Sequence, residues 1–326
     1  MSKIKKEIYN LEFPPYVSQL EIGGYIFKRI DNYNQLITEL QHFVNISGSE
    51  NPIQPNTGKH MITATVSIPE NEIKCCLPWT DPNSTQILDV LFLLTIFTGR
   101  SVFVKEWEGD APIIADHRIH QWGGQLQCSI KYEGMWRHKD TGEIKTEQEM
   151  EKSKIPIFDY DHIDIGFEKS LNKILTLISN PEWQEKYSGG YFLFLFRDAT
   201  FRQILEKSFL TCWTIWEQIF SIENSKWLPD EEIFRLGGDR KIAYILNKYF
   251  NKKIDKRALA NIKQLAKSRN RLVHFGKKTN DVTNEEKEMF IRLTEQLIAL
   301  ILGLEPSNIF NSLEKLNSFL NKQPHC

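Results

Sequence analysis

The stretch from residue 266 to residue 276 brings an arginine, an amide and an imidazole to the end of one predicted helix. A helix that begins near Asp255 and stops at Gly276 places Asn270 and His274, which are four residues apart, on the same face. Arg269 precedes His274 by five residues, which corresponds to about 140° around a regular helix. A long guanidinium arm covers such an offset, whereas a shorter side chain would not.

These three side-chain types suit cleavage of an RNA phosphodiester better than acyl transfer, because RNA supplies its own nucleophile as the 2′-hydroxyl. An imidazole moves protons near neutral pH. A planar, permanently charged guanidinium stabilises negative charge on phosphoryl oxygens. The set holds no carboxylate, and we expect the reaction to need no metal ion.

The run Arg269-Asn270-x-x-x-His274 resembles the R-x4-6-H motif of HEPN domains, in which a polar residue, often asparagine, follows the arginine. The resemblance covers roughly residues 190 to 305. It includes a preceding aromatic helix with an embedded acid, from Phe209 to Phe220. The spacing of four intervening residues is at the short end of the family's range.

The resemblance implies an endoribonuclease that needs no metal ion or cofactor and acts as a homodimer, with the motifs of two protomers facing each other. In such an enzyme His274 is the general acid and base, Arg269 holds and neutralises the scissile phosphate, and Asn270 orients one of them. RNA, including tRNA, is the implied substrate. Many proteins of this kind are toxins or abortive-infection effectors against phage, often with an unrelated N-terminal domain that senses a trigger, here a phage-derived one.

Two other functions remain open. A HEPN module can bind nucleotide, RNA or a protein partner without cutting, and then the motif serves for anchoring alone. Alternatively, the β-rich half is a sensor for a phage protein, a nucleic acid or a small molecule, and the helical half transmits the signal. The motif residues also have a purely structural interpretation, because cationic side chains near a helix C-terminus interact favourably with the last carbonyls.

The helix over residues 209–220 carries an aromatic stripe and one acid. Phe209, Trp213, Trp216 and Phe220 recur at i, i+4, i+7 and i+11, which predicts a core or a dimer interface. Glu217 lies beside Trp213 on this helix, and a buried carboxylate needs a cation or a hydrogen-bond donor. A basic group near the motif helix would make Glu217 a residue that orients the site, and a structural salt bridge is the alternative.

Positive charge is concentrated around the motif. The chain has 41 Lys and Arg against 42 Asp and Glu, yet residues 235–278 hold fourteen basic and two acidic residues. If these charges line a groove, we expect Lys267, Arg271, Lys277 and Lys278 to bind RNA; otherwise they form a solvated helix face. The aromatic residues interspersed here, which either stack on bases or fill the core, are Tyr244, Tyr249, Phe250 and Phe275.

The remaining patterns predict an α+β protein with a β-rich domain over residues 1–150 and an all-helical HEPN-like bundle over residues 151–326. Strands are expected at 24–30, 60–68, 73–77, 101–107 and 126–132, around one helix at 87–97. Helical spacing is found at 167–178, 191–220, 242–250, 259–273 and 290–304. The polar segment 139–162 is the expected linker.

The composition argues against a disordered or membrane-embedded chain, because 41% of the 326 residues are hydrophobic and 25% are charged. The most apolar run, from Ile87 to Phe97, is too short to span a bilayer, and no secretory leader is evident. The five cysteines lack the paired spacing of a zinc site, and His117 and His120 lack a third ligand. We therefore expect a cytoplasmic protein without a metal site and without a membrane partner.

Overall fold

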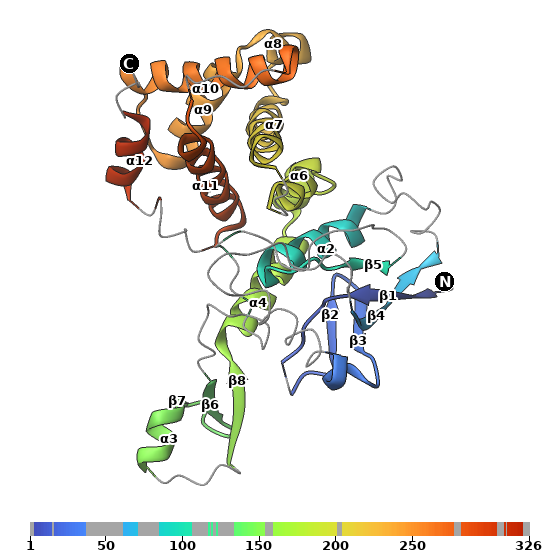
Figure 1. Cartoon of the computed structure of the whole chain (residues 1–326). Helices are drawn as coiled ribbons and strands as arrows, with labels where there is room; N and C mark the ends of the chain where they lie inside the picture. Colours follow the sequence, from blue (N-terminus) through green and yellow to red (C-terminus); the bar gives the residue numbers. More distant parts are fainter. Residues whose placement is uncertain are drawn as a thin grey trace. The chain divides into compact units, whose positions relative to one another are not determined.

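The structure of the chain, a computed structural model, is shown in Figure 1. The residues that it describes are 3–14, 16–36, 61–70, 85–105, 117, 119, 122, 134–153, 159–200, 204–276, 282–304, 310 and 312–321. They form an α+β protein, with antiparallel sheets in the N-terminal part and a largely helical C-terminal part, as the sequence predicted. The chain divides into two compact units, one made of residues 1–115 and 120–184 and the other of residues 116–119 and 185–326.

The main sheet of the first unit has five antiparallel strands in the order β2-β3-β4-β1-β5. Their bounds are Lys3–Tyr9 for β1, Gln19–Ile22 for β2, Tyr25–Arg29 for β3, Ile62–Pro69 for β4 and Phe103–Val104 for β5. Strand β4 confirms the alternation seen in the sequence, because Ala64, Val66 and Ile68 are all buried. Strand β1 pairs with β4 and β5.

Helix α2 (Thr85–Thr98) confirms the helix predicted at 87–97. Nearly every side chain from Ile87 to Phe97 is buried, which explains why the run is apolar on all sides. The helix ends before Gly99, whose φ of 65° is a backbone conformation that glycine adopts without strain. Helix α4 (Ile165–Ser179) packs against α2 and against strands β2 and β8.

The polar segment expected to be a linker contains regular structure instead. A second antiparallel sheet has the order β7-β6-β8, with β6 at Gly134–His138, β7 at Ile144–Thr146 and β8 at Tyr160–Asp164. Helix α3 (Glu147–Ser153) follows β7. Two apolar side chains of this segment, Met150 and Tyr160, are buried, as is Ile163 just after it, so a few well-placed residues outweigh its polar average. The strands expected at 73–77 and 126–132 lie outside the described residues.

The second unit is helical. Its helices are α6 (Tyr191–Thr200), α7 (Leu205–Asn224), α8 (Asp230–Arg235), α9 (Gly238–Phe250), α10 (Lys256–Phe275), α11 (Asn284–Leu302) and α12 (Leu313–Leu320), and it also holds the end of α5 (Pro181–Tyr187). The helices predicted at 242–250, 259–273 and 290–304 are confirmed. The pattern at 191–220 corresponds to two helices, α6 and α7, rather than one.

The aromatic stripe of α7 lies in the core of the second unit. Phe209, Trp213 and Trp216 are each less than 2% exposed, and all three rings contact Phe290 of α11. The indole N–H of Trp216 also donates a hydrogen bond of 2.9 Å to Oγ1 of Thr294. This packing fixes the position of α7, on which the acidic residue Glu217 lies.

Among the helices that the structure describes, none combines the length and hydrophobicity that crossing a bilayer requires. Cys212 of α7 is a buried free thiol, whereas the other four cysteines lie outside the described part of the chain. His117 is buried next to the ring of Phe196, whereas His120 lies outside the described residues.

Candidate functional site

Helix α10 positions the motif, and both of its ends have a local cause. At the N-terminus the side chain of Asp255 accepts a hydrogen bond of 2.8 Å from the backbone N–H of Ala258. At the C-terminus Gly276 adopts a left-handed conformation with φ of 60°. The helix therefore runs from Lys256 to Phe275, as predicted, and His274 lies in its last turn.

Arg269 is held on two sides. Its Nη2 lies 3.4 Å from Oε2 of Glu217 on α7, and its Nη1 donates a hydrogen bond of 2.9 Å to Oδ1 of Asn270. The side chains of Arg269 and Glu217 are each 26% exposed, so the pair lies at the edge of the helical packing. Glu217 thus has a basic partner on the motif helix, and that partner is the motif arginine.

Glu217 is itself oriented by the core. Its second carboxylate oxygen, Oε1, accepts a hydrogen bond of 2.9 Å from the indole N–H of Trp213. The first residue of α9, Gly238, lies against both side chains. A Cβ atom at Gly238 would stand 2.9 Å from Oε1 of Glu217 and 2.9 Å from the ring of Trp213. The hydrogen-bonded series Trp213–Glu217–Arg269 therefore depends on the absence of a side chain at position 238.

His274 is exposed and lies on a different face of α10 from Arg269. In the described part of the chain no hydrogen bond joins it to Arg269 or Asn270. The offset of about 140° between Arg269 and His274 is not bridged, because the arginine arm points toward α7 instead. One protomer consequently brings Arg269, Asn270 and Glu217 together and leaves the imidazole accessible by itself.

Basic residues that were expected to bind RNA are distributed as follows. Lys267 and Arg271 are exposed on α10, and Lys277 and Lys278 lie outside the described residues. Of the four interspersed aromatic residues, three pack inside the unit. The ring of Tyr244 contacts Phe220, that of Phe250 stacks on Trp216, and Tyr249 donates a hydrogen bond to the carboxylate of Glu223. Phe275 differs, because 72% of it is exposed.

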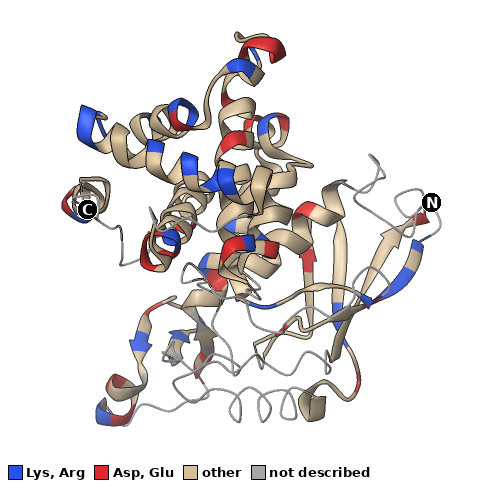
Figure 2. Cartoon of the chain, turned by 45° about the horizontal axis from the view of Figure 1, so that its top comes forward, with Lys and Arg blue, Asp and Glu red and all other residues tan. Residues whose placement is uncertain are grey.

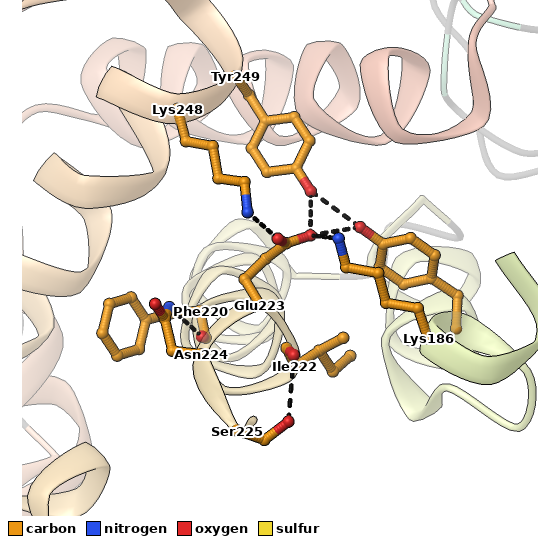
Figure 3. A network of polar contacts seen from close by, with 9 residues as sticks. Lys186, Phe220, Ile222, Glu223, Asn224, Ser225, Lys248 and Tyr249 are labelled. Carbon is orange, nitrogen blue, oxygen red and sulfur yellow. Dashed lines mark hydrogen bonds and ion pairs between the residues drawn. The ribbon is translucent and has the colours of Figure 1, made fainter. Parts of the chain in front are cut away.

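A second polar cluster, centred on Glu223 of α7, was not anticipated. Lys186 and Tyr187 of α5 and Lys248 and Tyr249 of α9 converge on this carboxylate, as Figure 3 shows for three of them. The Lys186 ammonium lies 2.6 Å from Oε1, and the two tyrosine hydroxyls are 2.8 Å apart. The Glu223 side chain is only 1% exposed, so the cluster fastens α5, α7 and α9 together.

The cluster also shifts two pKa values. Burial by itself would raise the pKa of Glu223, but hydrogen bonds from the two lysines and two tyrosines lower it to about 2. Burial and the adjacent Glu223 carboxylate raise the pKa of Tyr249 above its ordinary range. Glu223 is therefore ionised at neutral pH, and its charge is balanced by Lys186 and Lys248.

Sequence patterns give little warning of Gly238 and Glu223. Gly238 follows another glycine and precedes a helix, which indicates a turn and says nothing of Glu217. The tyrosine and lysine pairs at 186–187 and 248–249 meet only because α5 and α9 flank α7. Both features arise from contacts between helices that are distant in sequence.

In the described part of the chain no three His, Cys, Asp or Glu side chains are grouped closely enough to hold a metal ion. Comparison with protein-family models, with curated proteins and with solved structures found no match to this chain.

Proposed function

We propose that the chain is an endoribonuclease of the HEPN type, which cleaves RNA without a metal ion at an active site composed of two protomers. The observation that supports this most strongly is the end of α10. There an accessible imidazole, His274, follows a guanidinium, Arg269, that Glu217 and Asn270 hold in a defined direction. The homodimer and the catalytic roles are part of the proposal.

The proposed reaction needs two proton transfers. The 2′-oxygen forms a bond to phosphorus as one imidazole takes the 2′-hydroxyl proton, and the bond from phosphorus to the 5′-oxygen breaks as a second group donates a proton to it. A single α10 end offers one histidine, so a two-fold dimer that juxtaposes two copies of His274 supplies both groups. Arg269 neutralises the phosphoryl oxygens, and Asn270 restrains the guanidinium.

The biological setting belongs to the same proposal. A cytoplasmic toxin or abortive-infection effector would use the helical unit to cut RNA, tRNA among its targets. The β-rich unit would then respond to a phage-derived trigger. Nothing in the proposed chemistry calls for a cofactor.

The products test the mechanism. Purified protein incubated with tRNA or total RNA in excess EDTA should leave a 2′,3′-cyclic phosphate on one fragment and a 5′-hydroxyl on the other. An oligonucleotide that is cut at a known position should resist cleavage when that position alone carries 2′-deoxyribose. Fragments with a 3′-hydroxyl and a 5′-phosphate, or undiminished cutting at the 2′-deoxy position, would contradict the mechanism.

The absence of a bond between Arg269 and His274 within one chain favours one alternative, a HEPN module that binds nucleotide, RNA or a protein partner without cutting. The two functions differ in a direct measurement. A binding module retains intact RNA over long incubation at protein concentrations that saturate binding, whereas a nuclease converts it to fragments.

A further inference from the structure

The exposed face of α10 carries positive charge along its length. Successive steps of four residues, from Lys263 to Lys267 to Arg271, advance about 6 Å along the axis and about 40° around it. His274 falls on the same face, between the directions of Lys263 and Lys267. All four side chains are exposed. Figure 2 shows the basic residues recurring along the helix.

No carboxylate neutralises this face from within α10, because residues 256–275 contain six Lys and Arg and no Asp or Glu. Lys256, Arg257 and Lys263 form no ion pair with any residue that the structure describes. The row of charges therefore has the pattern of a surface that binds a polyanion.

Phe275 supplies a second, independent observation. It directly follows His274 and is 72% exposed, whereas the other aromatic residues of this basic region are packed against the core or in the Glu223 cluster. A solvent-exposed aromatic ring beside a row of cations is the combination found in proteins that bind single-stranded nucleic acids. In such proteins the phosphates contact the cations and a base stacks on the ring.

In the proposed dimer this face of one protomer approaches the same face of its partner, and its charge argues against direct contact between the two. A two-fold contact would place the same basic row against itself, since such an interface uses one surface patch on both subunits. With no acid on α10, the two rows would repel unless an anion lay between them. A polyanion relieves that repulsion.

We infer that single-stranded RNA binds along the exposed face of α10, with phosphates at Lys263, Lys267 and Arg271 and with one base stacked on Phe275 beside His274. This inference rests on the proposed function and assigns to that site a phosphate track and a base-stacking subsite. Phe275 would hold the nucleotide next to the cleaved bond.

Binding of a labelled single-stranded 2′-O-methyl RNA to the full chain tests the inference, because this RNA lacks the nucleophilic hydroxyl and stays intact. Each phosphate contact contributes about 0.7 to the slope of log binding constant against log salt concentration. The triple variant Lys263→Ala, Lys267→Ala, Arg271→Ala removes three such contacts and should therefore lower the magnitude of that slope by about 2. Phe275→Ala should weaken binding at least about fivefold without changing that steepness, and Phe275→Trp should restore it.

Matched controls come from exposed residues on other helices or connections. Lys226→Ala removes an exposed cation, and Tyr191→Ala removes an aromatic residue that is 51% exposed. Both should bind RNA as the unchanged chain does. Because every substituted side chain is exposed, circular dichroism and thermal melting should be unaffected, and a variant that fails these checks is replaced by the corresponding glutamine or leucine substitution.

Three results would overturn the inference. One is unchanged affinity and salt dependence in the triple variant and in Phe275→Ala. Another is equal competition by a duplex of the same sequence, which would remove the single-stranded specificity. The third is conversion of a dimer to a monomer by Phe275→Ala in light scattering, which would make Phe275 a protein contact. The proposed nuclease activity is tested separately from this inference. It would be contradicted if unmodified RNA were bound through this face but not cleaved.

Discussion

The guanidinium of Arg269 lies 3.4 Å from the carboxylate of Glu217, which joins the motif helix α10 to the core helix α7. A partly exposed ion pair contributes little to stability, typically under about 1 kcal/mol. Its value is therefore positional. With Asn270 on the other nitrogen and Trp213 behind the carboxylate, the charged end of Arg269 is restrained from both sides.

Glu217→Ala should reduce kcat for RNA cleavage by up to about 10²-fold, because a poorly placed guanidinium loses much of its effect on the transition state. Glu217→Gln should lose less, since the amide oxygen still accepts from one neighbour. Thermal melting and the division of the loss between kcat and KM provide the check. A drop in melting temperature with unchanged kcat would make Glu217 a purely structural residue.

Gly238→Ala tests the same chain from the side of α9. The added methyl group would stand 2.9 Å from Oε1 of Glu217 and from the Trp213 ring, closer than such atoms normally approach. We expect the carboxylate to be displaced and its bond from Trp213 to be lost, at a cost of about 1 kcal/mol in unfolding free energy. The rate of RNA cleavage should fall as well. It is measured as kcat under conditions in which the same fraction of each protein is folded.

A suitable comparison is Gly142→Ala, at a glycine of the first unit where an added Cβ atom would meet no atom of another described residue within 4 Å, apart from the chain neighbours. Its effect should be confined to the backbone strain of a positive φ. Equal activity of Gly238→Ala and the unchanged chain would show that Glu217 tolerates the displacement.

Gly276→Ala should fray the last turn of α10. Its left-handed φ of 60° costs a residue with a Cβ about 1 kcal/mol. Among the described residues, no atom outside the adjacent backbone lies within 4 Å of the added carbon, so backbone strain is the expected effect. Gly276→Asn should be milder, since asparagine tolerates this conformation. Hydrogen exchange of the amides around His274 measures the fraying. Exchange in Gly276→Ala as slow as in the unchanged chain would contradict the prediction.

Glu223→Gln should destabilise the helical unit by about 2 kcal/mol, because a buried carboxylate that accepts hydrogen bonds from charged donors is replaced by a neutral amide. Urea unfolding measures the change. Lys226→Ala, which removes only an exposed ion pair with Glu185, is the control and should be close to neutral. A Glu223→Gln protein as stable as the unchanged one would show that the cluster contributes nothing.

The pH dependence of this cluster has a definite sign. The pKa of Glu223 is about 2 in the folded chain and higher when unfolded, so its stabilisation is complete above the unfolded value of 4.5 and is lost as the pH falls toward 2. The stability difference between the unchanged chain and Glu223→Gln should therefore shrink between about pH 6 and about pH 3. A difference that grows on acidification would contradict the assignment.

Much of the fold was predictable where local signals agree. Asp255 and Gly276 bracket α10, and Thr283 with Glu286 forms a capping box at the start of α11, so these helices begin or end at residues with a clear chemical reason. Strand β1 was not among the strands predicted from the sequence, since its first residues include Lys3 and Lys5 and form no apolar run. In the structure they are the outward residues of a strand that β4 and β5 complete.

The candidate site was predictable only in part. The residue types and the spacing of Arg269, Asn270 and His274 follow from the sequence, and so does the need of Glu217 for a partner. The direction of the arginine arm does not, because a flexible side chain can reach several neighbours and tertiary packing decides among them. Gly238 illustrates the same limit, since its closeness to Glu217 depends on how α9 packs on α7.

The most direct measurement is cleavage of RNA in EDTA by the unchanged chain, by His274→Ala and by Arg269→Ala, with Lys226→Ala as the control. Removing a general acid or base typically costs about 10² to 10⁴ in rate, so both motif variants should fall to background while folding normally and the control should remain active. Cleavage by His274→Ala at the rate of the unchanged chain would contradict the account.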